Sequence, residues 1–512
     1  MIKNDVKNIS IKKAAFINAA ANYSCVILQL GFSAVLARIL LPEDYGVIGV
    51  MTVFTTFFSV LANMGIGTAV IQNKELSDYD VSNIFTFNLY VAVGLSIIFA
   101  IFSVPLSKFY GNSVYIPIGC LLSVSLFFST MNMVPNALLM KEKKFVRIGL
   151  RMITTTVVSS GIAIVLAKLG LKYYALAAQS IIQVMVNFIW NYSSTRIKLR
   201  IKCDFGSVKK IFSFSSYQFA FNVFNYFARN ADNLLVAKFM GDTQLGYYDK
   251  AYKLALYPEQ NLTHVITPVI HPILSEYQDD KAYIYENYMK IVKILSLLGL
   301  FVGAYMYFAS YEIICMMFGE HWAAAIPCLA MLSLSVWAQV VNSSSGAIFQ
   351  SLGNTKNLFI TGVLSSSTTL IGIVLGIVFG DISTVARNAM ISYNINFMIS
   401  YFMLIKMTFG FSFLKFLKSF IPDVCIAVMV CIAGFLTRYA TIDATNIVGI
   451  TINAVIKLAI MGGVYVIGLI LFRQYKYFIE IIHLELSSQM QRYIKINFKR
   501  RFPVQAFAWT LI

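Results

Sequence analysis

The chain has 512 residues, of which 58% are hydrophobic and only 12% are charged. An ordinary soluble domain has about a quarter charged residues, and an apolar chain of this length is hard to bury around one core. The composition excludes a conventional water-soluble protein, and the formal net charge of +18 must be explained within a membrane protein.

Apolar stretches long enough to cross a membrane recur along the whole chain. A helix needs about 20 such residues to span the hydrocarbon layer, whereas the strands of a membrane β-barrel would alternate polar and apolar residues. We therefore predict an all-α polytopic membrane protein of about fourteen transmembrane helices. The expected spans are 14–37, 46–71, 83–103, 113–138, 150–167, 173–194, 211–237, 245–274, 289–311, 323–349, 357–379, 384–408, 413–437 and 448–472.

Lysine and arginine are distributed unevenly between the two sets of loops. An even number of crossings places both termini on one side, and the loops and tail on that side hold 30 of the 41 cations, with Arg151 and Lys293 counted among them. Such an excess marks cytoplasmic loops, so both termini are expected in the cytoplasm. Attraction to anionic lipids then explains the net charge, and no nucleic-acid partner is expected.

The two ends of the chain are polar and basic. Residues 1–13 lead into an apolar stretch that is long enough to remain as the first helix, so no cleaved signal peptide is expected. Residues 473–512 are expected to form a basic cytoplasmic tail. The cysteines form no C-x-x-C pair and the histidines lack ligand spacing, so we expect no metal and no cofactor.

Two segments that lie 200 residues apart resemble each other. Ala37 to Gly46 and Ala237 to Gly246 share, in register, an alanine, a cation, two apolar residues and a glycine. Because six spans separate the copies, the two halves would have the same orientation and be related by a pseudo-twofold axis along the membrane normal. We expect six-helix halves at 1–200 and 201–410, two additional helices at 411–472, and the site between the halves.

Polar residues form stripes on three of the expected helices. Residues spaced by three or four share one helix face, and polar groups inside a membrane should face protein or a water-filled cavity. The stripes are Asn18, Asn22, Cys25 and Gln29; Ser215, Gln218, Asn222, Asn225, Arg229 and Asp232; and Lys250, Lys253, Tyr257, Gln260 and His264. Two intramembrane lysines favour a cationic cavity, whose charge Asp249 and Glu259 would partly offset. The alternative is that Arg229 and Asp232 pair and join helices.

Motifs of ATP-driven or hydrolytic chemistry are absent from the sequence. It contains no P-loop, G-x-G-x-x-G, H-E-x-x-H or G-x-S-x-G. The expected loops reach only about 20 residues, which is short for a loop that carries an active site. We expect a protein that is not an enzyme, with a membrane glycosyltransferase or glycan polymerase as the enzymatic alternative.

Two regions carry a family resemblance that covers residues 10–475. The run Ala37-Arg-Ile-Leu-Leu-Pro-Glu-Asp-Tyr-Gly46, followed by Asn63 to Gln72, resembles the amino-terminal signature of Wzx-type polysaccharide flippases. These belong to the multidrug/oligosaccharidyl-lipid/polysaccharide exporter superfamily. Arg229 to Asn233 and Gly246 to Tyr252 are similar to the seventh-to-eighth helix region of the same family.

The resemblance implies a flippase of the bacterial cytoplasmic (inner) membrane. It would move undecaprenyl-diphosphate-linked oligosaccharide by alternating access, for O-antigen, capsule or exopolysaccharide synthesis, with a polysaccharide polymerase and chain-length machinery as partners. A diphosphate needs cationic contacts in a low-dielectric cavity, so we expect Arg229 first, then Lys250 and Lys253. The other expected roles are exit residues at Arg38 and Lys238, sugar contacts at Asn22, Asn222, Asn225 and Gln218, and ion coupling at Asp232 or Glu259.

Other transporters of the superfamily remain as alternatives. A multidrug exporter would favour an acidic cavity for cationic drugs, which is opposite to the sign of these stripes. A peptidoglycan-precursor flippase is not separated by charge, since its substrate also carries a diphosphate. The two-half repeat counts against a glycan polymerase.

Overall fold

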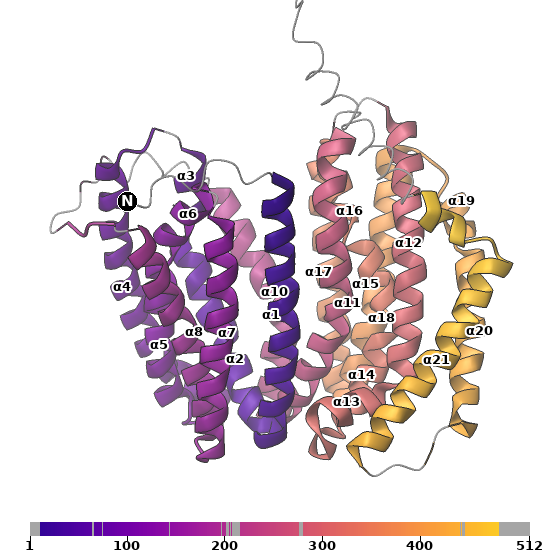
Figure 1. Cartoon of the computed structure of the whole chain (residues 1–512), viewed down its shortest axis with the longest axis horizontal. Helices are drawn as coiled ribbons and strands as arrows, with labels where there is room; N and C mark the ends of the chain where they lie inside the picture. The colour runs from indigo at the N-terminus through magenta and orange to yellow at the C-terminus, as the bar shows by residue number, and fades with distance from the viewer. Residues whose placement is uncertain are drawn as a thin grey trace, which may run out of the picture. The chain divides into compact units, whose positions relative to one another are not determined.

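The computed structural model describes residues 11–480, apart from 64–65, 74, 143, 196, 201–203, 205, 207–215, 276–279, 441 and 443–445. All regular secondary structure within these ranges is helical (Figure 1). The predicted all-α class is confirmed, because long apolar runs with no alternation satisfy their backbone hydrogen bonds only as helices inside a membrane.

The described part of the chain before residue 200 contains six long helices and two short ones. The elements are α1 (Ile11–Ile39), α2 (Pro42–Asn63), α3 (Ile66–Gln72), α4 (Asp78–Tyr110), α5 (Tyr115–Met131), α6 (Met133–Lys141), α7 (Phe145–Lys168) and α8 (Lys172–Thr195).

The rest of the described chain continues with long helices and several short ones. The elements are α10 (Ser216–Met240), α11 (Asp242–Ser275), α12 (Lys281–Phe308), α13 (Ser310–Phe318), η1 (Glu320–Trp322), α14 (Ala325–Ser333), α15 (Val336–Asn342), α16 (Ser345–Ser351), α17 (Thr355–Phe379), α18 (Ile382–Tyr401), η2 (Phe402–Phe409), α19 (Phe413–Lys418), α20 (Ile421–Leu436), η3 (Thr437–Tyr439) and α21 (Ile447–Leu471).

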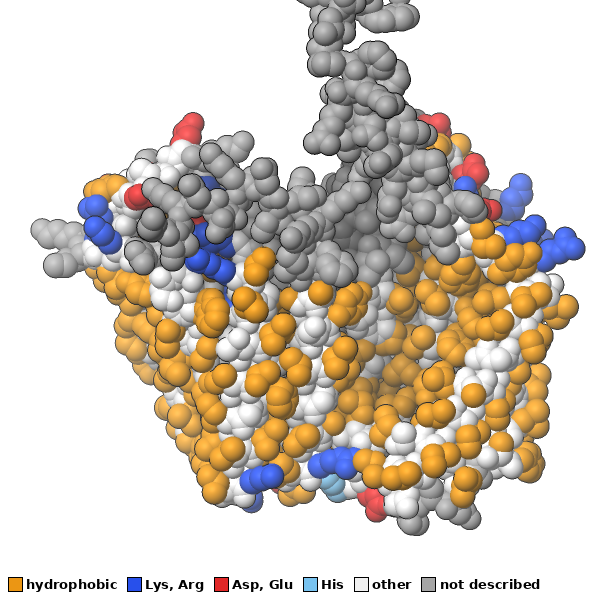
Figure 2. Space-filling view, viewed as in Figure 1, with side chains coloured by type: hydrophobic (Ala, Val, Ile, Leu, Met, Phe, Trp, Pro, Cys, Tyr) orange, Lys and Arg blue, Asp and Glu red, His pale blue; other side chains and the backbone are white. Residues whose placement is uncertain are grey.

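Nine helices of the described chain are long and apolar enough to cross a membrane, or ten if the bent pair Ala325–Ser333 and Val336–Ser351 is one span. The chain is therefore a multi-pass membrane protein. Three further long helices, α8, α11 and α18, are not among these spans because polar residues interrupt their apolar sequence. Figure 2 shows hydrophobic side chains over the visible flanks of the helices and charged side chains gathered near the helix ends.

Tight turns place the two helix hairpins that carry the site. Between α1 and α2, the Asp44 carboxylate accepts the Leu41 backbone N–H at 2.9 Å and the Tyr173 N–H at 3.1 Å, so it also ties this turn to the start of α8. Between α10 and α11, Gly241 has φ +88°, a conformation that only glycine adopts at low cost.

Contacts divide the chain into two compact units. The first unit comprises residues 1–254, 310–331 and 366–389, and the second comprises 255–309, 332–365 and 390–512. In the first unit, one apolar cluster joins α1, α7 and α8 through Leu36, Leu40, Ala163, Ala167, Ala175 and Leu176. Small alanines in this cluster let the helices approach closely, as is usual where membrane helices pack.

A buried ion pair joins helices within the second unit. Lys293 of α12 lies 2.6 Å from the Asp423 carboxylate of α20, and their side chains are 4% and 0% exposed. Lys293 and Arg151, both counted as loop cations from the sequence, are in fact buried within helices. The error lies in the cation count, because the expected spans 150–167 and 289–311 already contain both residues, whose burial depends on partners elsewhere in the chain.

Candidate functional site

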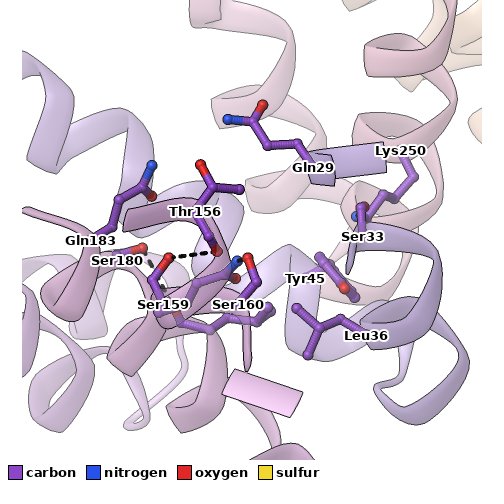
Figure 3. A pocket seen from close by; sticks show the side chains of 12 residues that line it. Gln29, Ser33, Leu36, Tyr45, Thr156, Ser159, Ser160, Ser180, Gln183 and Lys250 are labelled. Atoms are coloured by element: carbon purple, nitrogen blue, oxygen red, sulfur yellow. Dashed lines mark hydrogen bonds between the residues drawn. The ribbon is translucent and has the colours of Figure 1, made fainter. Parts of the chain in front are cut away.

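A polar cavity of about 330 Å³ lies within the first unit, among α1, α2, α7, α8 and α11 (Figure 3). Its volume falls within the range of small-ligand pockets. Hydroxyl and amide side chains make up most of its wall, which is formed by Gln29, Ser33, Leu36, Tyr45, Thr156, Ser159, Ser160, Leu176, Gln179, Ser180, Gln183 and Lys250.

Lys250 is the one charged residue among the described residues that line this cavity. Its side chain is buried, with the residue 7% exposed. The ammonium group donates to Ser33 Oγ at 2.9 Å and lies 3.8 Å from the centroid of the Tyr45 ring, a cation–π distance.

No carboxylate of the described residues forms an ion pair with Lys250. Asp249, its neighbour in sequence, pairs instead with Lys253 at 2.6 Å. A buried charge is costly unless it is paired, and one hydroxyl with the ring faces of Tyr45 and Phe318, at 3.8 and 5.3 Å, compensates an ammonium only in part. The cavity therefore presents a cation for which no described residue supplies the counter-ion, which is the arrangement expected of a site for an anionic ligand.

Two glycines position Lys250 against the first hairpin. A β-carbon on Gly46 would overlap the backbone carbonyl of Asp242, and one on Gly246 would overlap the carbonyl of Pro42. Gly246 and Asp242 correspond to Gly46 and Pro42 at the offset of 200 residues. The two contacts are therefore equivalent, each between the glycine of one copy and the turn of the other. Because Lys250 follows Gly246 by one helical turn, the close approach brings its side chain beside α1 and α2.

Further contacts join residues of the two copies to other helices of the first unit. Arg38 donates to the Met316 carbonyl at 2.6 Å, and Lys238 donates to the Phe109 carbonyl. Asp242 accepts from Asn112 at 2.8 Å and from the Tyr115 hydroxyl. Arg38 and Lys238 thus hold helix ends together and do not line the cavity.

A ladder of side-chain hydrogen bonds joins α7 to α8. Its rungs are Arg151 to Asn191 at 2.8 Å, Thr155 to Asn187 at 3.2 Å, and Gln179 to Ser160 at 2.9 Å. Sequence reasoning did not select these residues. A usable signal exists on α8, where Gln179, Gln183, Asn187 and Asn191 recur every four residues and so share one face.

The remaining predicted contacts lie away from the cavity or outside the described residues. Arg229 is exposed on α10, Lys253 is 59% exposed, and Asn22 is exposed on α1. The side chains of Gln218, Asn222 and Asn225 lie outside the described residues.

Asp232 and Glu259, the expected coupling residues, occupy different units. Asp232 is buried in the first unit, where its carboxylate accepts the Asn233 N–H at 2.8 Å and the Tyr248 hydroxyl at 3.4 Å. It forms no ion pair with Arg229, so the alternative of a cementing pair is not formed in the described structure. Glu259 is half-buried on α11 in the second unit.

The described residues contain no group of three or more His, Cys, Asp and Glu side chains that could hold a metal ion.

Comparison with known proteins adds sequence and fold relationships. Residues 35–327 match the family described as polysaccharide biosynthesis protein. The chain is 26% identical over 412 residues to the lipopolysaccharide biosynthesis protein WzxC of Escherichia coli (strain K12), covering 77% of this chain and 81% of that protein. It is 24% identical over 411 residues to the teichuronic acid biosynthesis protein TuaB of Bacillus subtilis (strain 168), covering 78% and 84%.

A solved structure shares the fold. The lipid II flippase MurJ in an inward closed conformation superposes with a TM-score of 0.68 at 17% identity, covering 90% of this chain and 99% of that one. At this identity the likeness establishes the fold alone.

Proposed function

The chain belongs to the polysaccharide biosynthesis protein family, and from this we propose that it is a flippase for undecaprenyl-diphosphate-linked oligosaccharide repeat units. It moves them across the bacterial cytoplasmic membrane for surface polysaccharide synthesis, by alternating access. The observation that carries the proposal is Lys250, a buried cation that pairs with no carboxylate in the described part of the chain and lies in a cavity lined by hydroxyls and amides.

The chemistry of a lipid diphosphate matches this cavity. Its oxygens accept charge-assisted hydrogen bonds, which are roughly twice as strong as neutral ones, and attraction between charges is stronger where water is excluded. Lys250 retains donor capacity, because only one of its three N–H groups is used by Ser33. We assign it the diphosphate, and we keep Arg229 and Lys253 as contacts along the route to the cavity.

The proposal includes the finer topology expected from the sequence. It comprises about fourteen spans with both termini cytoplasmic, halves at 1–200 and 201–410 related by a pseudo-twofold axis, and two added helices at 411–472. The reciprocal contacts of Gly46 and Gly246 support the axis, because a twofold relation makes each contact imply the other. Arg38 and Lys238 then close the exit, and Asn22, Asn222, Asn225 and Gln218 contact sugar hydroxyls.

The same proposal assigns a carrier role without catalysis. WzxC and TuaB are named for lipopolysaccharide and teichuronic acid biosynthesis, which favours an intermediate of surface polysaccharide synthesis over the lipid II that the name of MurJ states. A polysaccharide polymerase and chain-length machinery would receive the flipped product on the outer side.

Transport in liposomes tests this function and separates it from its main alternative. The purified protein should expose a lipid-linked oligosaccharide, initially shielded on the inner leaflet, to an impermeant glycosidase added outside. The peptidoglycan lipid precursor should move more slowly under the same conditions. A protein that moves only the peptidoglycan precursor would be a cell-wall flippase, and one that moves neither lipid would contradict the proposal.

Asp232 is proposed as the coupling residue, because intramembrane acids commonly carry the coupling ion. The Asp232→Asn variant keeps the carboxylate's size but cannot titrate. We expect its transport in liposomes to lose dependence on an ion gradient while substrate binding persists, and Glu259→Gln serves as the comparison. Equal transport by the wild-type protein with and without the gradient would remove the coupling role.

A further inference from the structure

The series of side-chain hydrogen bonds between α7 and α8, the ladder, is interrupted at one position, a missing rung, where it borders the cavity. Gln183 lies one turn from Asn187 and one turn from Gln179, whose side chains both bond across to α7. At its own level it faces Thr156 and Ser159, yet among the described residues its amide has no hydrogen-bond partner. Ser159 turns to its own helix and donates to the Thr156 carbonyl at 3.4 Å.

The cavity occupies the place of this missing rung. Figure 3 shows Gln183 and Ser180 on the side of the cavity that lies away from Lys250 and Ser33. The Gln183 side chain is half-buried and lines the cavity, so a polar ligand there would supply the hydrogen-bond partners that its amide lacks among the described residues. The Gln183 amide both donates and accepts, which suits neighbouring hydroxyl groups on one ring.

The charges of the residues that line the cavity narrow the chemical class of the ligand further. Lys250 is its single charged residue among the described lining residues, and no carboxylate or second cation faces the Gln183 side. A sugar carrying its own carboxylate would enter without a partner for that charge, whereas a neutral sugar offers only hydroxyls.

We propose that the gap in the ladder is a subsite for an uncharged sugar, the one attached directly to the diphosphate, and that Gln183 determines specificity for it. The subsite rests on the proposed function, because it takes the diphosphate at Lys250 as its reference point. The diphosphate and the first sugar then occupy opposite walls of one cavity, and the rest of the oligosaccharide extends beyond it.

Binding of three lipids to the full-length protein in nanodiscs tests the subsite. The probes are undecaprenyl diphosphate, the same lipid carrying one neutral hexose, and the same lipid carrying one hexuronic acid. Gln183→Leu should weaken binding of the hexose lipid by about 5- to 100-fold, because sugar hydroxyls are left unpaired. It should leave the sugar-free lipid unchanged within about twofold. The wild-type protein should bind the uronic acid lipid at least about tenfold more weakly than the hexose lipid.

Two further variants serve as a second test of the subsite and as a control. Ser159→Ala, on the opposite helix, removes only a hydroxyl and should show the same selective loss for the hexose lipid. Gln350→Leu makes the same exchange at an exposed position of α16 and should change nothing. The subsite would be overturned if Gln183→Leu and Ser159→Ala weakened binding of the sugar-free and hexose lipids equally, or weakened neither. It would also be overturned if the wild-type protein bound the hexose and uronic acid lipids with equal affinity. A wild-type protein that binds none of the three lipids would overturn the proposed function as well.

Discussion

Replacing Lys250 with methionine is expected to reduce transport by at least about 30-fold. Removing one partner of a buried charge pair costs about 2 kcal/mol or more, and the variant loses the one ammonium that the described residues direct into the cavity while keeping similar bulk. Surface polysaccharide yield in a flippase-deficient strain, at matched protein level, measures the effect. Lys250→Arg should retain part of the activity, because it keeps the charge.

Lys168→Met provides the control for this experiment. Lys168 is exposed at the last turn of α7 and does not line the cavity, so its loss should leave polymer yield unchanged. Full polymer yield with Lys250→Met would show that the cavity cation is not needed for transport.

Replacing Gly46 with valine is expected to lower transport by about 10- to 100-fold, because overpacking at a tight contact costs about 1–3 kcal/mol. The new side chain would overlap the Asp242 carbonyl, and backbone cannot move aside as a flexible side chain would. The first turns of α2 and α11 would have to separate. Gly246→Val should have the same effect through Pro42.

Spin labels at Leu41 and Thr243, in a variant without native cysteines, measure that separation directly. Both positions are exposed beside the two turns. The distance distribution should lengthen in Gly46→Val and Gly246→Val, and it should not change in Gly94→Val, where an added β-carbon meets no atom within 4 Å. Reduced transport with an unchanged distance would mean that the glycines act in some other way.

The fold class was predictable because its signal is local. Runs of about 20 apolar residues specify membrane helices whatever their neighbours are, and the multi-pass architecture followed from them. The assignment of Arg151 and Lys293 to loops was wrong, since a cation near the end of an expected span stays in a loop or becomes buried according to its tertiary partners. Asn191 and Asp423 supply those partners from 40 and 130 residues away.

The candidate site was only partly predictable. Helical spacing selected Lys250, and the structure places it in a cavity, but spacing could not rank it above Arg229 because both lie on polar stripes. The repeat indicated that Gly46 and Gly246 are equivalent. The repeat could not indicate that Gly46 packs against Asp242 and Gly246 against Pro42, because these contacts form between segments about 200 residues apart.

The α7–α8 ladder was missed for a different reason. Serine and threonine are common in membrane helices, where they satisfy neighbouring backbone groups. The run Thr154, Thr155 and Thr156 therefore carried little weight alone. The hydrogen-bonding role of this run depends on the polar face of α8, which comes into contact with α7 only when the chain folds.

The most direct test measures whether Lys250 recognises the diphosphate. The purified protein would be titrated with undecaprenyl-diphosphate-linked oligosaccharide and with the same oligosaccharide on uncharged undecaprenol, in the wild type and in Lys250→Met. The wild type should prefer the diphosphate lipid by at least about 30-fold, as expected for about 2 kcal/mol from a buried charge-assisted contact, and the variant should lose most of that preference. An equal preference in the two proteins would contradict the assignment of Lys250 as the diphosphate-binding residue.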